Sequence, residues 1–303
     1  MSATAVSTPP RAQSPGVVLT AFLVMVVLGG ANFVAVRFSN VELAPFWGAG
    51  SRFVLAAVLL GLIGLALRLP FPRGRTLGGA ILYGLLGFGV FYALAYVGLQ
   101  GASAGSGAVL LSLAPLTTFL LAFAQRQERF RWRALIGALV ALAGIVVMFG
   151  APGGVPLGSV LAFVGAAVAV GEAGVIAKWF PDDAHPVTMN AVAMGVGSAL
   201  LLIMSLIAGE SWELPTLSAT WTALIYLILL GSVGLFVLYL YILRSWSASR
   251  AAYAFVLFPV VASLLGLWLE GDPITPALAL GGVIVLGGVY IGALHRPASA
   301  SGQ

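Results

Sequence analysis

Long apolar runs follow one another along the whole chain, separated by short segments that hold charges, prolines or clusters of glycine and serine. A helix needs about 20 mostly apolar residues to cross the hydrocarbon core of a bilayer. The pattern therefore predicts ten transmembrane helices joined by short connections, with no separate soluble domain. The predicted spans cover residues 17–36, 44–67, 77–98, 104–124, 134–150, 158–177, 187–208, 219–243, 251–269 and 275–294.

The composition also indicates a chain embedded in a membrane. Of the 303 residues, 61% are hydrophobic and only 8% are Asp, Glu, Lys or Arg, whereas a soluble domain carries about 25% charged residues. The mean hydropathy is +1.09. So few charges cannot form the polar shell of a water-soluble protein of this size, which excludes an ordinary soluble enzyme.

The chain offers little for catalysis or metal binding. It contains no cysteine, and its two histidines, His185 and His295, lie outside the apolar runs. A Gly-Ala-Ser-Ala-Gly run at 101–105 has the spacing of a nucleophile elbow, but that motif needs a preceding strand and a histidine partner. The basic residues are spread in small groups between the apolar runs, unlike a nucleic-acid surface. We therefore expect no enzyme, no cofactor, no metal and no nucleic-acid partner.

The basic residues lie almost entirely on one side of the predicted membrane. If the N-terminus is cytoplasmic, the inner segments hold 12 of the 14 Lys and Arg residues, which agrees with the positive-inside rule. These residues are Arg11, Arg68, Arg73, Arg75, Arg126, Arg129, Arg131, Arg133, Lys178, Arg244, Arg250 and Arg296. The outer connections hold the acidic residues Glu42, Glu210, Glu213, Glu270 and Asp272. An even number of spans then places both termini in the cytoplasm.

The chain contains an internal repeat with a shift of 144 residues. The stretch LQGASAGSGAVLLSLAP, which ends at Pro115, aligns with LRSWSASRAAYAFVLFP, which ends at Pro259. Each half holds five spans, an odd number, so the second half must insert upside down. Inverted repeats are typical of transporters that bind substrate near the midplane. We expect an all-α polytopic membrane protein of two inverted five-helix repeats. The predicted units are an N-terminal tail, two repeats and a C-terminal tail, at residues 1–16, 17–150, 158–294 and 295–303.

The order of several short motifs resembles that of the EamA family of the drug/metabolite transporter superfamily. The motifs are Asn-Phe-Val-Ala-Val-Arg at 32–37, Pro45 followed by Arg52-Phe53, Leu-Ala-Pro at 113–115 and Leu-Phe-Pro at 257–259. Each motif is weak, but their order and spacing cover essentially the whole chain. Within the family, the chain is most similar to bacterial exporters of aromatic and other neutral amino acids.

The resemblance implies a secondary transporter of the bacterial inner membrane. It would export aromatic and other neutral amino acids, or related amphiphilic metabolites, by alternating access around a central aromatic-lined cavity. One alternative is a multidrug or lipophilic-cation exporter. Another, from a different class, is an integral membrane enzyme that acts on lipid-linked substrates. The expected partners are a small-molecule substrate and the lipid bilayer.

Two ionisable residues fall well inside predicted spans, where a charge costs about 2.5–3.5 kcal/mol on insertion scales. Arg52 lies eight residues into the second span, about 12 Å deep at 1.5 Å per residue. We expect it either to attract a substrate carboxylate or to tether neighbouring helices. Glu172 lies about five residues from the inner end of the sixth span. It either couples transport to protons or seats a substrate ammonium, or it lines a hydrated vestibule.

Aromatic residues form a stripe along the third span. Phe88, Tyr92 and Tyr96 recur at every fourth position and therefore share one face of a helix. The 144-residue shift aligns Tyr92 with Phe236, near Tyr239, so aromatic faces from both repeats are predicted to line one cavity. Such walls suit apolar or aromatic substrates, and tyrosine hydroxyls can orient polar groups. The alternative is an interfacial aromatic belt.

Two polar residues and two prolines complete the candidates. Asn32 and Tyr253 are expected to contact substrate, with a hydrogen bond between helices as the alternative. Pro115 and Pro259 interrupt the backbone hydrogen bonds of their spans. We expect these prolines to act as hinges for gating, with ordinary helix kinks as the alternative.

Overall fold

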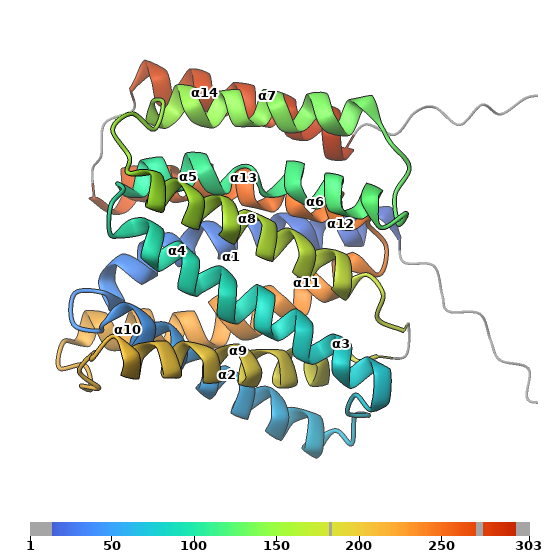
Figure 1. Ribbon diagram of the computed structural model, residues 1–303, viewed down its shortest axis with the longest axis vertical. Helices are drawn as coiled ribbons and strands as arrows, with labels where there is room; N and C mark the ends of the chain where they lie inside the picture. The colour runs from blue at the N-terminus through green and yellow to red at the C-terminus, as the bar shows by residue number, and fades with distance from the viewer. Residues whose placement is uncertain (1–13, 182–183, 271–274, 295–303) are drawn as a thin grey trace, which may run out of the picture.

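The computed structural model describes residues 14–181, 184–270 and 275–294, and it is helical throughout these ranges apart from the connections (Figure 1). Its helices form ten spans that are long and apolar enough to cross a membrane, which confirms the predicted number. The elements are α1 (Pro15–Ser39), α2 (Pro45–Ala66), α3 (Gly74–Gly84), η1 (Leu85–Val90), α4 (Phe91–Leu99), α5 (Ala104–Leu111), α6 (Ala114–Ala124), α7 (Trp132–Phe149), α8 (Leu157–Ala177), α9 (Pro186–Ile207), α10 (Ser218–Ile228), η2 (Leu229–Gly234), α11 (Leu235–Leu243), α12 (Ala248–Ala252), α13 (Ala254–Glu270), α14 (Pro276–Val289) and η3 (Tyr290–Leu294), where η denotes a π-helical turn.

Proline marks the start of several spans. It is the first residue of α1, α2, α9 and α14, where its missing N–H group would have no partner within the helix in any case. Three of these helices also have a side-chain cap, and at α9 the imidazole of His185 accepts a hydrogen bond from the backbone nitrogen of Val187. The hydroxyl of Ser14 accepts a hydrogen bond from the backbone of Val17, and that of Thr275 accepts one from Leu278. Local sequence therefore determines where these spans begin.

The 144-residue register recurs in the backbone geometry. The third span consists of α3, η1 and α4, and the eighth consists of α10, η2 and α11. The π-helical turn η1 begins at residue 85 and η2 at residue 229, and both are followed by helices of nine residues. The same irregularity therefore occupies equivalent positions in the two halves, as the sequence repeat predicts.

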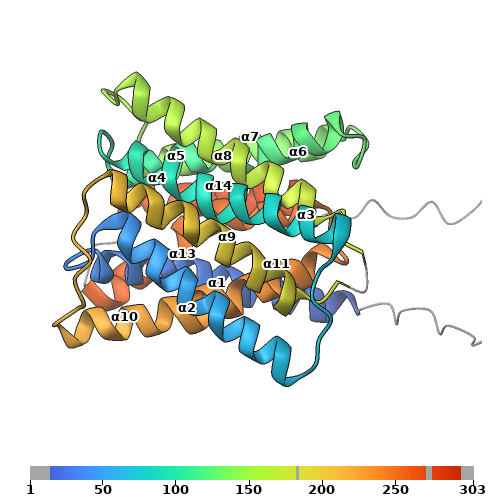
Figure 2. The ribbon, with the colours of Figure 1, turned by 60° about the horizontal axis from the view of Figure 1, so that its bottom comes forward.

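Contacts between helices also follow the repeat: where two spans pack together, the two aligned spans of the other half pack together as well. Helix α2 packs on α9, and α7 packs on α14, so these spans pair with their own counterparts. The contact of α1 with α13 is matched by that of α8 with α6, and the contact of α1 with α11 by that of α8 with α4. A pseudo-two-fold axis in the membrane plane produces this pattern. The α7–α14 and α2–α9 pairs form opposite edges of the bundle in Figure 1, and Figure 2 turns the α2–α9 edge towards the viewer.

A seam of glycines joins α7 to α14. A Cβ atom on Gly288 would lie 2.5 Å from the backbone nitrogen of Ala141 and 2.7 Å from the carbonyl oxygen of Gly137. A Cβ atom on Gly144 would lie 2.8 Å from the carbonyl oxygen of Gly281. The repeat aligns Gly137 with Gly281 and Gly144 with Gly288, so both halves present the same residues. Small residues allow this close backbone approach, which stabilises helix pairs in lipid by van der Waals contact.

The connections gather at two ends of unlike charge. Those that follow α2, α6, α8 and α11 lie together at what we call the arginine-rich end, on the right in Figure 1. Those that follow α1, α4, α7 and α9 lie at the opposite, arginine-poor end. The predicted separation of basic residues is therefore present in the described part of the chain. That the arginine-rich end faces the cytoplasm stays a prediction.

The two prolines proposed as hinges differ in their surroundings. The fourth span breaks between α5 and α6, and Pro115 is the second residue of α6. The ninth span breaks at Tyr253, between α12 and α13, and Pro259 lies inside α13. The repeats are thus not identical at this point. The hinge role of both prolines stays a prediction.

We expect Gly288→Ala to lower the thermal stability of the protein, because the new Cβ atom would collide with the backbone of α7. Overpacking of this kind costs about 1–3 kcal/mol. Gly287→Ala is a matched control, since a Cβ atom there meets nothing within 4 Å and alanine favours a helix by about 1 kcal/mol. Thermal unfolding of the purified protein in detergent measures both variants. Equal melting temperatures would contradict the glycine seam.

Candidate functional site

Four aromatic rings from both repeats meet inside the bundle. They belong to Phe53 of α2, Phe88 of η1, Tyr92 of α4 and Phe236 of α11, and we call them the aromatic cluster. The ring centroid of Phe53 lies 5.2 Å from that of Phe88 and 5.0 Å from that of Tyr92. The centroids of Phe88 and Phe236 are 4.5 Å apart. The rings meet edge to face, which their charge distribution favours. The cluster brings the stripe of the third span together with Phe236, the position that the repeat aligns with Tyr92.

Tyr96 continues the stripe towards the arginine-poor end. Its ring centroid lies 6.5 Å from that of Tyr92 and 5.8 Å from that of Phe46, which is the second residue of α2. Tyr96 therefore lies beside the aromatic cluster, between it and the start of α2. Of the three residues predicted to form one face, two belong to the cluster and the third adjoins it.

Arg52 lies against the aromatic cluster. Its side chain is 3% exposed, and its guanidinium carbon is 4.6 Å from the ring centroid of Phe53 and 5.1 Å from that of Tyr92. Its Nε atom is buried without a hydrogen-bond partner. No carboxylate in the described part of the chain forms an ion pair with it. Cation–π contacts worth about 0.5–2 kcal/mol offset only part of the cost of burying this charge.

Further polar atoms without partners lie around the cluster. The amide of Asn190 donates from Nδ2 to the carbonyl oxygen of Phe236 at 2.9 Å, and its Oδ1 atom is buried and unpaired. The Tyr83 hydroxyl is also buried and unpaired, and the Tyr83 ring packs against Phe88 with centroids 5.6 Å apart. Buried polar groups usually have a partner. These atoms therefore mark a place where a bound molecule or water would find hydrogen bonds.

The remaining polar candidates lie outside the cluster. Asn32 donates from Nδ2 to the carbonyl oxygen of Gly231, 3.0 Å away in η2, so it ties α1 to the eighth span. The Tyr253 hydroxyl donates to the carbonyl oxygen of Ala134, 2.8 Å away in α7. Tyr239 directs its hydroxyl to α8, where a Cβ atom on Gly174 would lie 2.5 Å from it. All three make contacts between helices.

Glu172 lies towards the arginine-rich end of α8 and is half-buried. Its carboxylate accepts a hydrogen bond of 2.6 Å from the side-chain amide of Gln125, at the end of α6. Nearby, Gln127 donates to the backbone carbonyl of Val175 at 2.9 Å. These bonds join the fourth and sixth spans across the two repeats. Neither bond involves a residue of the aromatic cluster.

Sequence reasoning did not select Phe53, Tyr83 or Asn190 as binding candidates. Phe53 follows Arg52 directly, and Tyr83 lies in the same span as the stripe, so both offered a signal. Asn190 offered a weaker signal, as a polar residue within the predicted seventh span, but its place beside the cluster depends on the approach of α9 to α11. The missed residues surround the predicted ones and complete the site.

A carboxylate caps the start of α2 at the arginine-poor end. Glu210, which follows α9, accepts hydrogen bonds from the backbone nitrogens of Phe46 at 3.1 Å and Trp47 at 2.7 Å. These N–H groups belong to the first turn of a helix, where they lack partners and attract negative charge. The Trp47 and Trp212 rings stack 4.6 Å apart beside this cap. A residue of the second repeat thus caps a helix of the first.

A second carboxylate makes the converse contact. Glu42, which follows α1, accepts hydrogen bonds from the backbone nitrogens of Thr216 at 2.9 Å and Leu217 at 3.1 Å, just before α10. Hydrogen bonds from the Thr216 and Thr220 hydroxyls lower the pKa of Glu42 from 4.5 to about 2. We call the Glu42 and Glu210 contacts the cross-caps. They hold the two repeats together at this end.

Comparison with known proteins agrees with this architecture. The model of the EamA-like transporter family matches residues 16–150 and 157–293. A solved crystal structure superposes with a TM-score of 0.76 over 93% of this chain and 98% of that chain, at 21% identity. At that identity the likeness shows the fold alone.

Curated relatives are named as transporters. The chain is 32% identical over 281 residues to the uncharacterized inner membrane transporter YedA of Escherichia coli K12, which covers 87% of each chain. It is 29% identical to an S-adenosylmethionine/S-adenosylhomocysteine transporter of Chlamydia trachomatis, over 80% of this chain and 79% of the relative. The expected resemblance to the EamA family is therefore confirmed. The chain is a multi-pass inner-membrane transporter that belongs to the EamA-like transporter family.

Proposed function

We propose that the protein exports neutral amino acids, aromatic ones above all, and related amphiphilic metabolites. Arg52 would hold the substrate carboxylate, and the aromatic cluster would separate to admit an apolar or aromatic side chain. The unpaired Oδ1 atom of Asn190 would accept a hydrogen bond from the amino group, and the Tyr83 hydroxyl would donate one to the carboxylate or accept one from the amino group. Transport would proceed by alternating access between the repeats.

The buried charge of Arg52, which forms no ion pair within the described part of the chain, is the observation that carries this proposal. Its guanidinium has five N–H donors in a plane, a geometry that suits a carboxylate. A substrate carboxylate would offset the cost of burying the charge, which the Phe53 and Tyr92 rings offset only in part. Recognition by a buried charge and aromatic rings favours a molecule that has both an acidic group and an apolar body.

The named substrates of one relative belong to the same chemical class. S-adenosylmethionine and S-adenosylhomocysteine, carried by the Chlamydia trachomatis relative, are amino-acid derivatives with an aromatic base. They share a carboxylate and an aromatic ring with phenylalanine and tryptophan. The comparison supports the class of substrate, and we propose the simpler amino acids because the aromatic cluster offers mainly apolar contacts.

The cross-caps suggest how one end of the transporter closes. Both join a connection of one repeat to a helix start in the other. If the repeats rock apart at the arginine-poor end, both carboxylates must leave their helix starts together. The conformation described here would then be closed at that end, with the substrate site shielded by Tyr96, Phe46 and the stacked Trp47 and Trp212.

Arg52→Gln is expected to weaken phenylalanine transport by raising KM about tenfold or more, since a charge-assisted hydrogen bond contributes about 1.5–3 kcal/mol. Counterflow of labelled phenylalanine into proteoliposomes measures the effect. Tyr253→Phe is the control, because it removes a hydroxyl that binds Ala134 away from the cluster, and its KM should match that of the wild type. Wild-type proteoliposomes that exchange phenylalanine no faster than empty liposomes would refute the proposal.

A lipophilic-cation exporter is the second candidate, and the half-buried Glu172 carboxylate favours it. In that case Glu172→Gln should abolish efflux of tetraphenylphosphonium and leave phenylalanine counterflow unchanged. Under our proposal the protein carries phenylalanine, and Glu172→Gln removes an acceptor that Gln125 already occupies. The two substrates, measured on the same variant, separate the candidates.

Glu42→Gln is expected to lower the melting temperature by an amount that is constant above about pH 5. The pKa of Glu42 is about 2 in the folded protein against an ordinary 4.5, so its stabilisation is present above pH 4.5 and is lost as the pH falls towards 2. The difference between wild type and variant should shrink over that window. Glu213→Gln serves as the control for removal of a charge at the same end. A difference that grows on acidification would contradict the capping role.

A further inference from the structure

Ser232 lies in the π-helical turn η2 of the eighth span, and its side chain is fully buried. Its Oγ atom has no hydrogen-bond partner among the described residues. Three other buried serines satisfy their hydroxyls locally, since Ser39, Ser112 and Ser198 each donate to the carbonyl oxygen three residues earlier. A buried hydroxyl without a partner destabilises a folded chain. The Oγ atom of Ser232 is therefore available to a partner from outside the chain.

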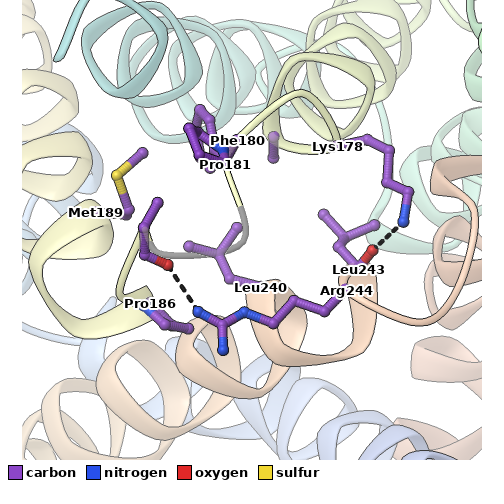
Figure 3. Close-up of a pocket in the computed structure, with 10 residues that line it drawn as sticks. Lys178, Phe180, Pro181, Pro186, Met189, Leu240, Leu243 and Arg244 are labelled. Atoms are coloured by element: carbon purple, nitrogen blue, oxygen red, sulfur yellow. Dashed lines mark hydrogen bonds between the residues drawn. The ribbon is translucent and has the colours of Figure 1, made fainter. Parts of the chain in front are cut away.

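One face of the eighth span connects Ser232 to the aromatic cluster. Ser232, Phe236 and Leu240 recur at every fourth position and therefore share a face. Phe236 belongs to the aromatic cluster, and Leu240 lines the pocket at the arginine-rich end that Figure 3 shows. The adjacent residue Gly231 packs against Asn32 of α1 instead. Ser232 thus lies on the cluster side of the span, about 6 Å along the helix from Phe236.

The repeat relates Ser232 to Tyr92. The 144-residue shift aligns Ser232 with Phe88, and it aligns Phe236 with Tyr92. The Phe88 and Phe236 rings are in contact, and the pseudo-two-fold axis relates this pair to Ser232 and Tyr92. Where the first repeat has a ring, the second therefore has a hydroxyl in a π-helical turn, a feature that is frequent at functional sites. This hydroxyl belongs to the Tyr92 side of the cluster, where Arg52 lies against the ring.

We propose that Ser232 is a specificity-determining residue that recognises the amino group of the substrate. Its Oγ atom accepts a hydrogen bond from the ammonium group while Arg52 holds the carboxylate. An ammonium group has three N–H donors, so it can also meet Oδ1 of Asn190, whose amide is held by the carbonyl of Phe236. The contact selects amino acids over carboxylic acids of similar shape. This inference rests on the proposed transport of amino acids, but recognition of an amine can be measured separately from transport.

The test measures three labelled ligands on the full chain in phosphatidylcholine nanodiscs by scintillation proximity. They are phenylalanine, phenylpropionate, which lacks the amino group, and phenylethylamine, which lacks the carboxylate. The wild type should prefer phenylalanine to phenylpropionate, and Ser232→Ala should reduce this preference about tenfold or more, because a hydrogen bond to a charged group is lost. Its affinity for phenylpropionate should stay unchanged, and its affinity for phenylethylamine should fall.

Ser112→Ala is the matched control, because it removes a buried hydroxyl that donates to the carbonyl of Val109 at 2.6 Å. It should keep the wild-type preference for phenylalanine and lower the melting temperature measured without ligand. Ser232→Ala should leave that melting temperature unchanged or raise it, since it removes an unpaired polar group. A fall would show that the Ser232 hydroxyl has a structural partner and would overturn the proposal.

The proposal is also overturned if Ser232→Ala keeps the wild-type preference, or if it weakens phenylalanine and phenylpropionate binding equally. If the wild type binds phenylethylamine through Ser232 but fails to exchange phenylalanine, the proposed function is refuted and the amine contact stands. If the wild type binds none of the three ligands, both are refuted.

Discussion

The absence of water from the bilayer core constrains this structure more than any other factor. Backbone and side-chain polar groups must find partners within the chain, because an unpaired group in hydrocarbon costs several kcal/mol. At the π-helical turn of the eighth span, Asn32 supplies a donor to Gly231, and Asn190 does so for Phe236 one turn later. At the arginine-poor end, Glu42 and Glu210 satisfy helix starts in the opposite repeat. The bonds made by Asn32, Glu42 and Glu210 join the two halves through polar groups that neither half could satisfy alone.

The same constraint makes the exceptions informative. Arg52, Tyr83 and Asn190 keep buried atoms without partners, and all three lie in or next to one set of aromatic rings. Of the six buried side-chain atoms that lack a partner in the described part of the chain, three therefore gather around a single point. Packing explains the rings, because they fill their own space edge to face, but it does not explain the unpaired polar atoms. The substrate site is proposed where the folded chain by itself is incomplete.

Features that depend on local sequence were predictable. The ten spans follow from the length of apolar runs, and the contact of the third-span stripe with Phe236 follows from the repeat. Features that depend on residues far apart in the sequence were not. The cross-caps required knowledge that Glu42 meets Thr216, 174 residues away. Tyr253 was expected either to contact substrate or to form a hydrogen bond between helices, and the acceptor that its hydroxyl meets, the carbonyl of Ala134, lies 119 residues away. The hydrophobic periodicity of the sequence does not predict such pairings between distant residues.

The glycine seam has a consequence for how the two halves are joined. Gly137 faces Gly288, and Gly281 faces Gly144, so each half presents its aligned glycines to the other. Such an isologous contact needs no covalent bond between its two sides. Two separate five-helix chains that insert in opposite directions could form the same seam. The segment between α7 and α8 therefore fixes the stoichiometry and the opposed orientation of the halves, while the interface itself is already encoded within each one.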